Sequence, residues 1–137
     1  MIDKLILNTD GGARGNPGPA GIGAVFTDGS GKIIAEYKEY IGITTNNVAE
    51  YRALILGLEK AKDFKYGQLE CRLDSELVVR QVNGEYKVKV EHLKDYRNRV
   101  KDLALFAPIT FTHVPRENNK RADALVNQAI DEATKSK

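Results

Sequence analysis

The chain has 137 residues and a mass of 15.2 kDa, which suits a single domain, residues 1–137, that can bury a core without disulfides. Its content of 42% hydrophobic and 29% charged residues is typical of a soluble globular protein and excludes a disordered chain. A formal net charge of +2 leans towards anionic partners but is too small to indicate a dedicated nucleic-acid binder.

The cysteine count and the N-terminal sequence predict the cellular compartment of the protein. Cys71 is the only cysteine, so an internal disulfide and a thiolate zinc site are both excluded, which suits a reducing environment. Met1 leads directly into strand-like sequence without signal-peptide features, and no stretch is long enough to cross a membrane. We therefore expect a cytoplasmic protein with no membrane partner, and a monomer because no apolar stripe or heptad run indicates association.

The first predicted element is a buried strand. The apolar run Leu5–Leu7 predicts it, and we expect it to end on Asp10, where Gly11 and Gly12 would let the backbone turn and leave room for a ligand. An Asx turn at Asp10 is the alternative without chemistry.

A glycine-rich segment, 12–21, then predicts a loop. It lacks the glycine spacing of dinucleotide-binding and phosphate-binding loops. Two runs rich in Ile, Val, Phe and Tyr, 21–27 and 32–41, flank the turn sequence at 28–31 and indicate a hairpin. The first three strands would form an antiparallel meander.

Helices and strands alternate in the rest of the chain. From Asn47, apolar residues recur at helical spacing and predict a long helix, for which Gly67 would supply the stop. Further elements are predicted at 68–74 (strand), 75–82 (helix), 90–105 (helix), 109–113 (strand) and 121–134 (helix). This order predicts an α/β fold with a five-stranded mixed sheet, three antiparallel strands and two added in parallel, flanked by helices.

Four carboxylates fall at one edge of this predicted sheet, outside the carboxyl ends of its parallel strands. Asp10 and Asp74 end strands, Glu50 lies on the inward face of the first helix, and Asp123 lies in the first turn of the last. Each has a structural alternative: a capping box of Asn47 with Glu50, an N-cap at Asp74, and a favourable helix-dipole position for Asp123.

Together, the four carboxylates predict a metal site. No matched cluster of Lys or Arg accompanies them, so they would repel one another unless hard cations were bound. Ligation by oxygen alone suits Mg²⁺ or Mn²⁺. Two such ions held ~3.5–4 Å apart are the clamp used for in-line displacement at phosphate, which predicts metal-assisted phosphodiester hydrolysis.

Four segments carry these residues in order: TDGGARGNPGPAG at 9–21, TTNNVAEY at 44–51, LDSELV at 73–78 and HVPRENNKRAD at 113–123. They resemble the successive motifs of the type 1 ribonuclease H family, and the resemblance spans nearly the whole chain. It implies a ribonuclease H-like fold and hydrolysis of the RNA strand of RNA–DNA hybrids with two Mg²⁺ ions, for which Mn²⁺ would substitute. The products would carry 5′-phosphate and 3′-hydroxyl ends.

The resemblance also implies roles for the carboxylates. Asp10 would bridge both ions, Asp74 and Glu50 would hold one, and Asp123 would complete the other. Glu50 would also lie near the 2′-hydroxyl beside the scissile phosphate, the group by which a protein distinguishes RNA from DNA. The substrate-binding set implied by the family is Gly11, Gly12, Arg14 and Asn16 for the RNA strand, with Asn46 and Asn47 near the boundary between the strands. For the last two asparagines, helix capping is the alternative.

His113 matches the family's mobile histidine, which is thought to assist proton transfer or product release. The alternative is an ordinary histidine at a strand end, with Arg116, Glu117 or Asn119 of the following loop assisting instead.

The chain departs from the family in two places. Segment 83–90 is short and the chain has no Trp, which resembles compact members without the basic protrusion that grips the DNA strand. Basic residues that would replace this grip, or form a solvated surface, are Lys87, Lys89, Lys94, Arg97 and Arg99. Glu76 stands where many members have a glutamine that touches the RNA.

Three alternatives to a free-standing ribonuclease H stay open. One is a related metal-dependent nuclease that also cleaves double-stranded RNA or structured DNA. Another is a catalytically inactive hybrid-binding module, although the four filled acidic positions argue against it. The third is a domain cut from a larger reverse transcriptase; the start at Met1 and the polar tail Ser136–Lys137 favour a free-standing enzyme.

Overall fold

The computed structural model describes residues 1–105 and 107–135, so the polar tail at Ser136–Lys137 lies outside the described residues. The strands are β1 (Ile2–Ala13), β2 (Gly18–Thr27), β3 (Ile33–Thr44), β4 (Tyr66–Leu73) and β5 (Ile109–His113). The helices are α1 (Asn46–Ala61), α2 (Glu76–Val82), α3 (Glu91–Ala104) and α4 (Lys120–Thr134), and a 3₁₀ turn spans Arg116–Asn118.

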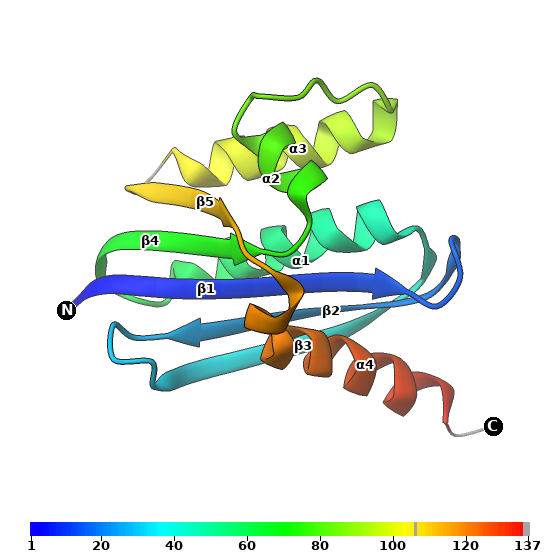
Figure 1. The fold of residues 1–137 in the computed structure, drawn as a ribbon, viewed down its shortest axis with the longest axis horizontal. Helices are drawn as coiled ribbons and strands as arrows, with labels where there is room; N and C mark the ends of the chain where they lie inside the picture. The colour runs from blue at the N-terminus through cyan, green and yellow to red at the C-terminus, as the bar shows by residue number, and fades with distance from the viewer. Residues whose placement is uncertain (106, 136–137) are drawn as a thin grey trace.

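The five strands form one mixed sheet in the order β3-β2-β1-β4-β5 (Figure 1). The pairs β1–β2 and β2–β3 are antiparallel, whereas β1–β4 and β4–β5 are parallel. The predicted meander with two added parallel strands is therefore confirmed.

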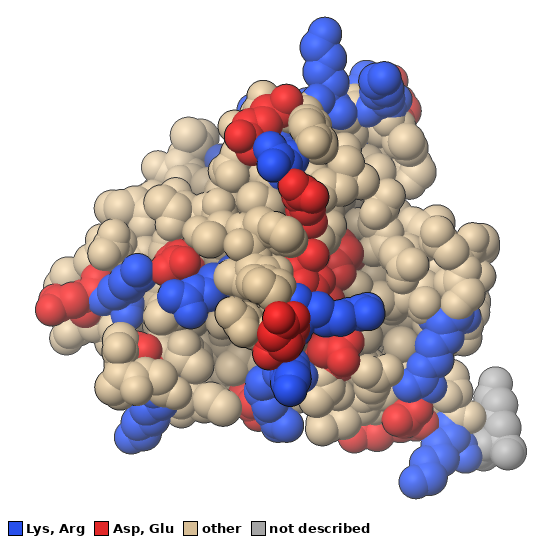
Figure 2. Space-filling view, in the orientation of Figure 1, with Lys and Arg blue, Asp and Glu red and all other residues tan. Residues whose placement is uncertain are grey.

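Helices cover both faces of the sheet. α1 packs on β1 and β2 with α3 behind it, while α4 packs on β2 and β3. Neighbouring residues of a strand point to opposite faces, and accordingly Gly11 faces α1 and Gly12 faces α4. Among the described helices, none combines the length and the apolar character that a bilayer crossing requires. Figure 2 shows basic and acidic side chains interspersed over one face of the molecule, with acidic ones gathered near its middle.

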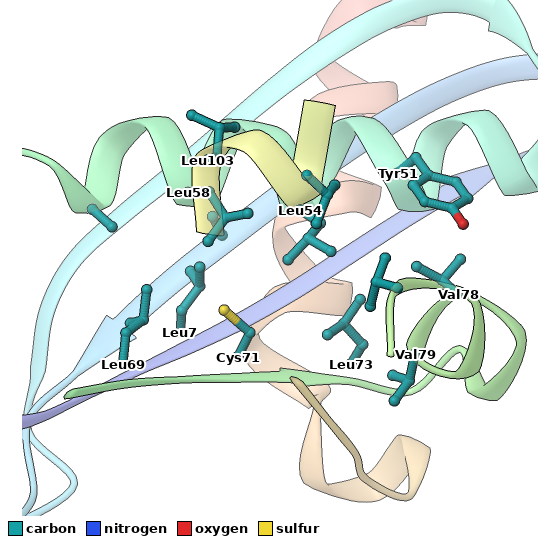
Figure 3. Close-up of a cluster of buried hydrophobic side chains, with 14 of the residues drawn as sticks. Leu7, Tyr51, Leu54, Leu58, Leu69, Cys71, Leu73, Val78, Val79 and Leu103 are labelled. Atoms are coloured by element: carbon teal, nitrogen blue, oxygen red, sulfur yellow. The ribbon is translucent and has the colours of Figure 1, made fainter. Parts of the chain in front are cut away.

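The main core lies between the sheet and α1 (Figure 3). Alternate residues of β4, namely Leu69, Cys71 and Leu73, point to this core, as the period-two pattern predicts. α1 contributes Tyr51, Leu54 and Leu58, which recur at helical spacing and are buried.

β1 does not end at Asp10, and that prediction is wrong. The strand continues to Ala13 because residues 10–13 still pair with β2. Its parallel partner β4 stops earlier, since the last register pair between them joins Asn8 to Arg72. Asp10 therefore lies beyond the end of β4, and the predicted loop at 12–21 shrinks to residues 14–17.

The helix stop assigned to Gly67 is also wrong. α1 ends at Ala61, with Lys62 as its C-cap, and Gly67 lies inside β4. A Cβ at Gly67 would lie 2.8 Å from the carbonyl oxygen of Asp3 on β1. The glycine thus permits close strand pairing and does not terminate the helix.

Gly23 of β2 allows α4 to rest directly on the backbone of the sheet. A Cβ there would lie 2.7 Å from the carbonyl oxygen of Ala122 and 2.9 Å from Cβ of Leu125. In the register of β1 and β2, Gly23 pairs with Asp10.

Glu70, on β4, forms a pH-dependent ion-pair group. It accepts from Arg72 Nε at 3.0 Å and contacts Lys4 Nζ at 2.9 Å, and its side chain is 15% exposed. The hydrogen bond from Arg72, with that from Lys4, lowers the pKa of Glu70 to about 2 despite its burial. Because the folded-state pKa lies below the unfolded value, the ionised pair stabilises the fold at neutral pH, and this contribution is lost as the pH falls towards about 2.

We therefore expect Glu70→Gln to lower the free energy of unfolding by about 1–2 kcal/mol at neutral pH, after allowance for solvent screening. Urea denaturation of wild type and variant should show the difference narrowing in acid. Glu132→Gln, which breaks the more exposed pair with Lys38, should change stability by less than about 0.5 kcal/mol. A Glu70→Gln deficit that stays constant with pH would contradict the assignment.

Candidate active site

Three carboxylates from different elements meet beyond the end of β4. Asp10 comes from β1, Glu50 from α1, and Asp74 follows β4; each offers an oxygen, and these oxygens all lie within 4.8 Å of one another. Asp10 is 6% exposed and Glu50 is 8% exposed, so two of the three charges are buried. The structure thus brings together residues that the sequence placed at one sheet edge.

The position of Glu50 depends on Gly11. The backbone N–H of Gly11 donates to Glu50 Oε1 at 3.1 Å. α1 approaches β1 so closely that a Cβ on Gly11 would lie 2.2 Å from the carbonyl carbon and oxygen of Ala49. A residue without a side chain is therefore required at this contact.

The capping alternatives for two of the carboxylates are wrong. α1 begins after Thr45, whose side chain accepts from the N–H of Val48 at 3.3 Å, so no capping box involves Glu50. α2 is capped by Ser75, whose Oγ accepts from Val78, and Asp74 is left out of the cap.

Asp123 is the fourth carboxylate, half-buried in the first turn of α4. It lines a cavity of about 410 Å³ together with Asp10, Glu50 and Asp74. Two basic side chains, Arg14 and Arg116, line the same cavity, and Arg14 is paired with Asp131 at 2.7 Å. Two guanidinium groups, one of them already paired, do not match the four carboxylates, as the sequence predicted.

Burial and mutual repulsion dominate the electrostatics of these carboxylates. Burial raises the pKa of Asp10 far above its ordinary value, and the neighbouring charges of Glu50 and Asp74 raise it further. Burial also raises the pKa of Glu50, which the amide of Gly11 and the charge of Arg116 partly oppose. Within the described residues, Glu50 Oε2 is buried with no hydrogen-bond partner. Oxygen donors arranged in this way fit a hard divalent cation.

Comparison with known proteins decides the family. A family model described as reverse transcriptase-like matches residues 8–129. The solved structure of LC11-RNase H1 in complex with an RNA/DNA hybrid has a TM-score of 0.90 and 50% identity, covering 94% of this chain and 98% of that one. The chain belongs to the type 1 ribonuclease H family. The ribonuclease H-like fold expected from the motifs is thereby confirmed.

Two relatives are longer than this ribonuclease H chain. Ribonuclease HI of Halobacterium salinarum is 48% identical over 125 residues, which are 90% of this chain and 63% of that protein. Bifunctional protein Rv2228c of Mycobacterium tuberculosis is 45% identical over 135 residues, which are 97% of this chain and 37% of that protein. The chain thus spans less than two thirds of either relative.

Most of the substrate-binding set expected for a ribonuclease H lines the acidic cavity: Gly11, Gly12, Arg14, Asn46 and Asn47. Asn16 does not line it. Its Oδ1 accepts from the N–H of Asn46 at 3.0 Å, and Asn46 Oδ1 accepts from the N–H of Ala13 at 2.7 Å. These asparagines brace the β1–β2 loop against the start of α1.

His113 does not line the acidic cavity, although in the register of β4 and β5 it pairs with Leu73, the residue before Asp74. It is exposed at the end of β5 and lines a different cavity, between α2 and β5, together with Glu76. Glu76 itself pairs with Arg80 at 2.9 Å. The catalytic role of His113 in a ribonuclease H reaction stays a prediction, as does that of Arg116, which lies at the acidic cavity.

The sequence assigned no role to Asn8, and it offered Asn119 only as an alternative to His113. Asn119 is 2% exposed and hydrogen-bonds to Asp74, and Asn8 hydrogen-bonds to Asn119. The signal for Asn8 is a polar residue that interrupts the apolar start of β1, two positions before Asp10 and on the same face.

Proposed function

We propose that this ribonuclease H hydrolyses the RNA strand of RNA–DNA hybrids and leaves 5′-phosphate and 3′-hydroxyl ends. The observation that carries the proposal is the convergence of Asp10, Glu50 and Asp74, whose oxygens lie within 4.8 Å of one another at an open cavity. The name of the Halobacterium relative and the hybrid complex of LC11-RNase H1 support the same activity. We propose that the protein acts as a monomer in the cytoplasm.

We propose that the site binds two Mg²⁺ ions, with Mn²⁺ as a substitute, because the residues present fit a hard divalent cation. The donor set is made of carboxylate oxygens, and the unpartnered Glu50 Oε2 is a buried atom to which a cation would give a partner. Asp10, Glu50, Asp74 and Asp123 would hold the ions. When bound, such ions lower the pKa of a water nucleophile and stabilise the leaving oxygen of an in-line displacement.

The chain's own groups would position the substrate. Gly12, which faces the cavity-lining Val126, brings no side chain into the cavity, so the sugar–phosphate backbone of the RNA can approach the carboxylates closely. The carboxylate of Glu50 would accept from the 2′-hydroxyl beside the scissile phosphate, which favours an RNA strand over a DNA strand.

Cleavage of strand-labelled duplexes tests the proposal. In Mg²⁺ or Mn²⁺, we expect cutting of the RNA strand of the hybrid, no cutting of its DNA strand, and no activity in EDTA. Double-stranded RNA and double-stranded DNA serve as comparisons. Cleavage of the RNA duplex at a similar rate would replace the proposal by that of a broader metal-dependent nuclease. Folded protein that binds the hybrid but never cuts it would be a binding module.

We propose that a second cavity binds the DNA strand of the hybrid. It has a volume of about 540 Å³ and is lined by apolar residues, by Lys87 and Lys89, and by Glu85, which is paired with Arg80 at 3.7 Å. Asn47 lines both this cavity and the acidic one, so the two are adjacent. Lys94, Arg97 and Arg99, the other basic residues expected here, do not line this cavity. Lys94 pairs with Glu91, Arg99 pairs with Glu59, and Arg97 donates to Asn98 Oδ1. We therefore narrow the proposed grip to the two lysines that line the cavity.

The double variant Lys87→Gln/Lys89→Gln is expected to weaken hybrid binding and to reduce the slope of log K against log salt by about 0.9 for each phosphate that is no longer neutralised. Fluorescence anisotropy in EDTA measures this without cleavage. Lys94→Gln/Arg99→Gln removes the same charge from paired residues and should change the slope little. Equal slopes for wild type and Lys87→Gln/Lys89→Gln would assign these lysines to the solvated surface.

A further inference from the structure

Asn119 holds one of the carboxylates without belonging to the acidic group. It is buried at the residue before α4, and its Nδ2 donates to the carbonyl oxygen of Thr9 at 2.9 Å and to Asp74 Oδ2 at 3.3 Å. Within the part of the chain that the structure describes, Asp74 accepts no other hydrogen bond on its carboxylate. The orientation of Asp74 thus depends on this amide.

Asn8 determines which way round the Asn119 amide lies. Asn8 Nδ2 donates to Asn119 Oδ1 at 3.0 Å and to the carbonyl oxygen of Asn118 at 3.4 Å. The reversed Asn119 amide would place Oδ1 against two acceptors, Thr9 O and Asp74 Oδ2, and would turn its NH₂ group towards the donor on Asn8. The donor of Asn119 is therefore directed at Asp74 by groups other than Asp74 itself.

A neutral donor suits a carboxylate that is to bind a cation. Lysine or arginine at this position would orient Asp74 but would also add a positive charge that opposes metal binding. The amide of Asn119 fixes one oxygen of Asp74 and leaves the negative charge of the carboxylate uncompensated.

Asn119 also joins three elements that carry carboxylates. Its bond to Thr9 attaches it to β1 beside Asp10, and its bond to Asp74 attaches it to the end of β4. Its own carbonyl oxygen accepts from the N–H of Asp123 at 3.1 Å in the first turn of α4. One side chain and its backbone therefore fix the relative places of these elements.

We propose that Asn119 is a positioning residue that, held by Asn8, keeps the Asp74 carboxylate in the orientation that binds a divalent cation. The inference deepens the proposed function and rests on it for any effect on cleavage. Its effect on metal binding is measured without nucleic acid.

Titration of the free protein with Mn²⁺, followed by the electron paramagnetic resonance signal of unbound Mn²⁺, tests the inference. Asn119→Ala is expected to weaken Mn²⁺ binding by roughly tenfold to a hundredfold. Asn8→Ala removes only the outer hydrogen bond and should weaken it by roughly threefold to fivefold. Asn118→Ala alters an exposed side chain of the same turn and should leave the affinity unchanged.

A purely structural role gives a different result. It would lower the Tm of Asn119→Ala in EDTA but leave the Mn²⁺ affinity of the folded protein at the wild-type value, and that result would overturn the inference. Asn8→Ala keeps the bond between Asn119 and Thr9, so it decides the question even where Asn119→Ala does not fold. An unchanged Mn²⁺ affinity in folded Asn8→Ala would likewise overturn the inference that Asn8 acts on Asp74 through Asn119.

Cleavage assays separate this inference from the proposed function. We expect Asn119→Ala to lower kcat for the hybrid, with KM for the hybrid unchanged and with partial restoration by excess Mg²⁺. Wild-type protein that binds Mn²⁺ but does not cut the hybrid would refute the proposed function, whereas the titrations would still decide the role of Asn119.

Discussion

Asp10→Asn is expected to abolish cleavage and, in EDTA, to make the protein more stable than the wild type. Asp10 is buried beside Glu50 and Asp74, and both burial and these charges raise its pKa. A raised folded-state pKa means that ionisation of Asp10 at neutral pH opposes folding. The neutral amide has nearly the same shape and removes this repulsion, so we expect the free energy of unfolding to rise by about 1–3 kcal/mol.

The same substitution removes one of the proposed metal ligands. We expect kcat for hybrid cleavage in Mg²⁺ to fall by roughly a thousandfold or more, because the charge that holds the cations is lost. Urea denaturation in EDTA and cleavage of a strand-labelled hybrid measure the two effects. Asp3→Asn, an exposed carboxylate near the start of β1, is the matched control and should change neither.

A substitution that raises the free energy of unfolding but abolishes cleavage identifies a carboxylate that serves function and not stability. A structural Asp10 would give Asp10→Asn lower stability, and activity per folded molecule close to the wild type. That outcome would remove Asp10 from the proposed metal site.

Gly11→Ala is expected to have the largest effect on stability, a loss of about 3–5 kcal/mol. The new Cβ would lie 2.2 Å from two backbone atoms of Ala49 and 2.6 Å from the nitrogen of Glu50. Backbone atoms of a helix cannot yield as a flexible side chain does, so α1 must move away from β1. The hydrogen bond from Gly11 to Glu50 Oε1 would be lost in the same movement.

Gly12→Ala is the matched control for this prediction. A Cβ at Gly12 would meet only Val126 Cγ1 at 3.7 Å, an ordinary contact, so we expect a change below about 1 kcal/mol. Urea denaturation of the two variants measures the difference. Equal stabilities would mean that α1 and β1 are not held together at Gly11.

Local patterns predicted the elements that local interactions determine. The alternation of Leu69, Cys71 and Leu73 predicted a face of β4, and the spacing of Tyr51 and Leu54 predicted the buried side of α1. These patterns follow from the periods of a strand and a helix, so no other part of the chain is needed to recognise them.

Long-range pairing determines what the sequence could not predict. Asp10 lies beyond the end of β4 because the parallel register of β1 and β4 stops at Asn8 and Arg72, and no local pattern near Asp10 contains that information. The predicted cap of α1 was wrong for a different reason. Thr45 and Asn47 are both competent caps, and backbone geometry selects Thr45.

The contact between Asn8 and Asn119 joins residues that are 111 positions apart in the chain. Two asparagines, one in a strand and one before a helix, give no sign that they share a hydrogen bond. The sheet and the placement of α4 bring them together, so the support for Asp74 became visible only in the folded chain.

Gly23 of β2 determines one distance within the site, that between Asp123 and Asp10. Because Gly23 pairs with Asp10 on the sheet and lies directly under Ala122, it sets how far Asp123 stands above Asp10. A methyl group at Gly23 would act as a spacer that lifts α4 and carries Asp123 with it, while Glu50 on the opposite layer keeps its place. The separation of the fourth carboxylate from the other three is therefore governed by a residue of β2 that contributes no side chain to the chemistry.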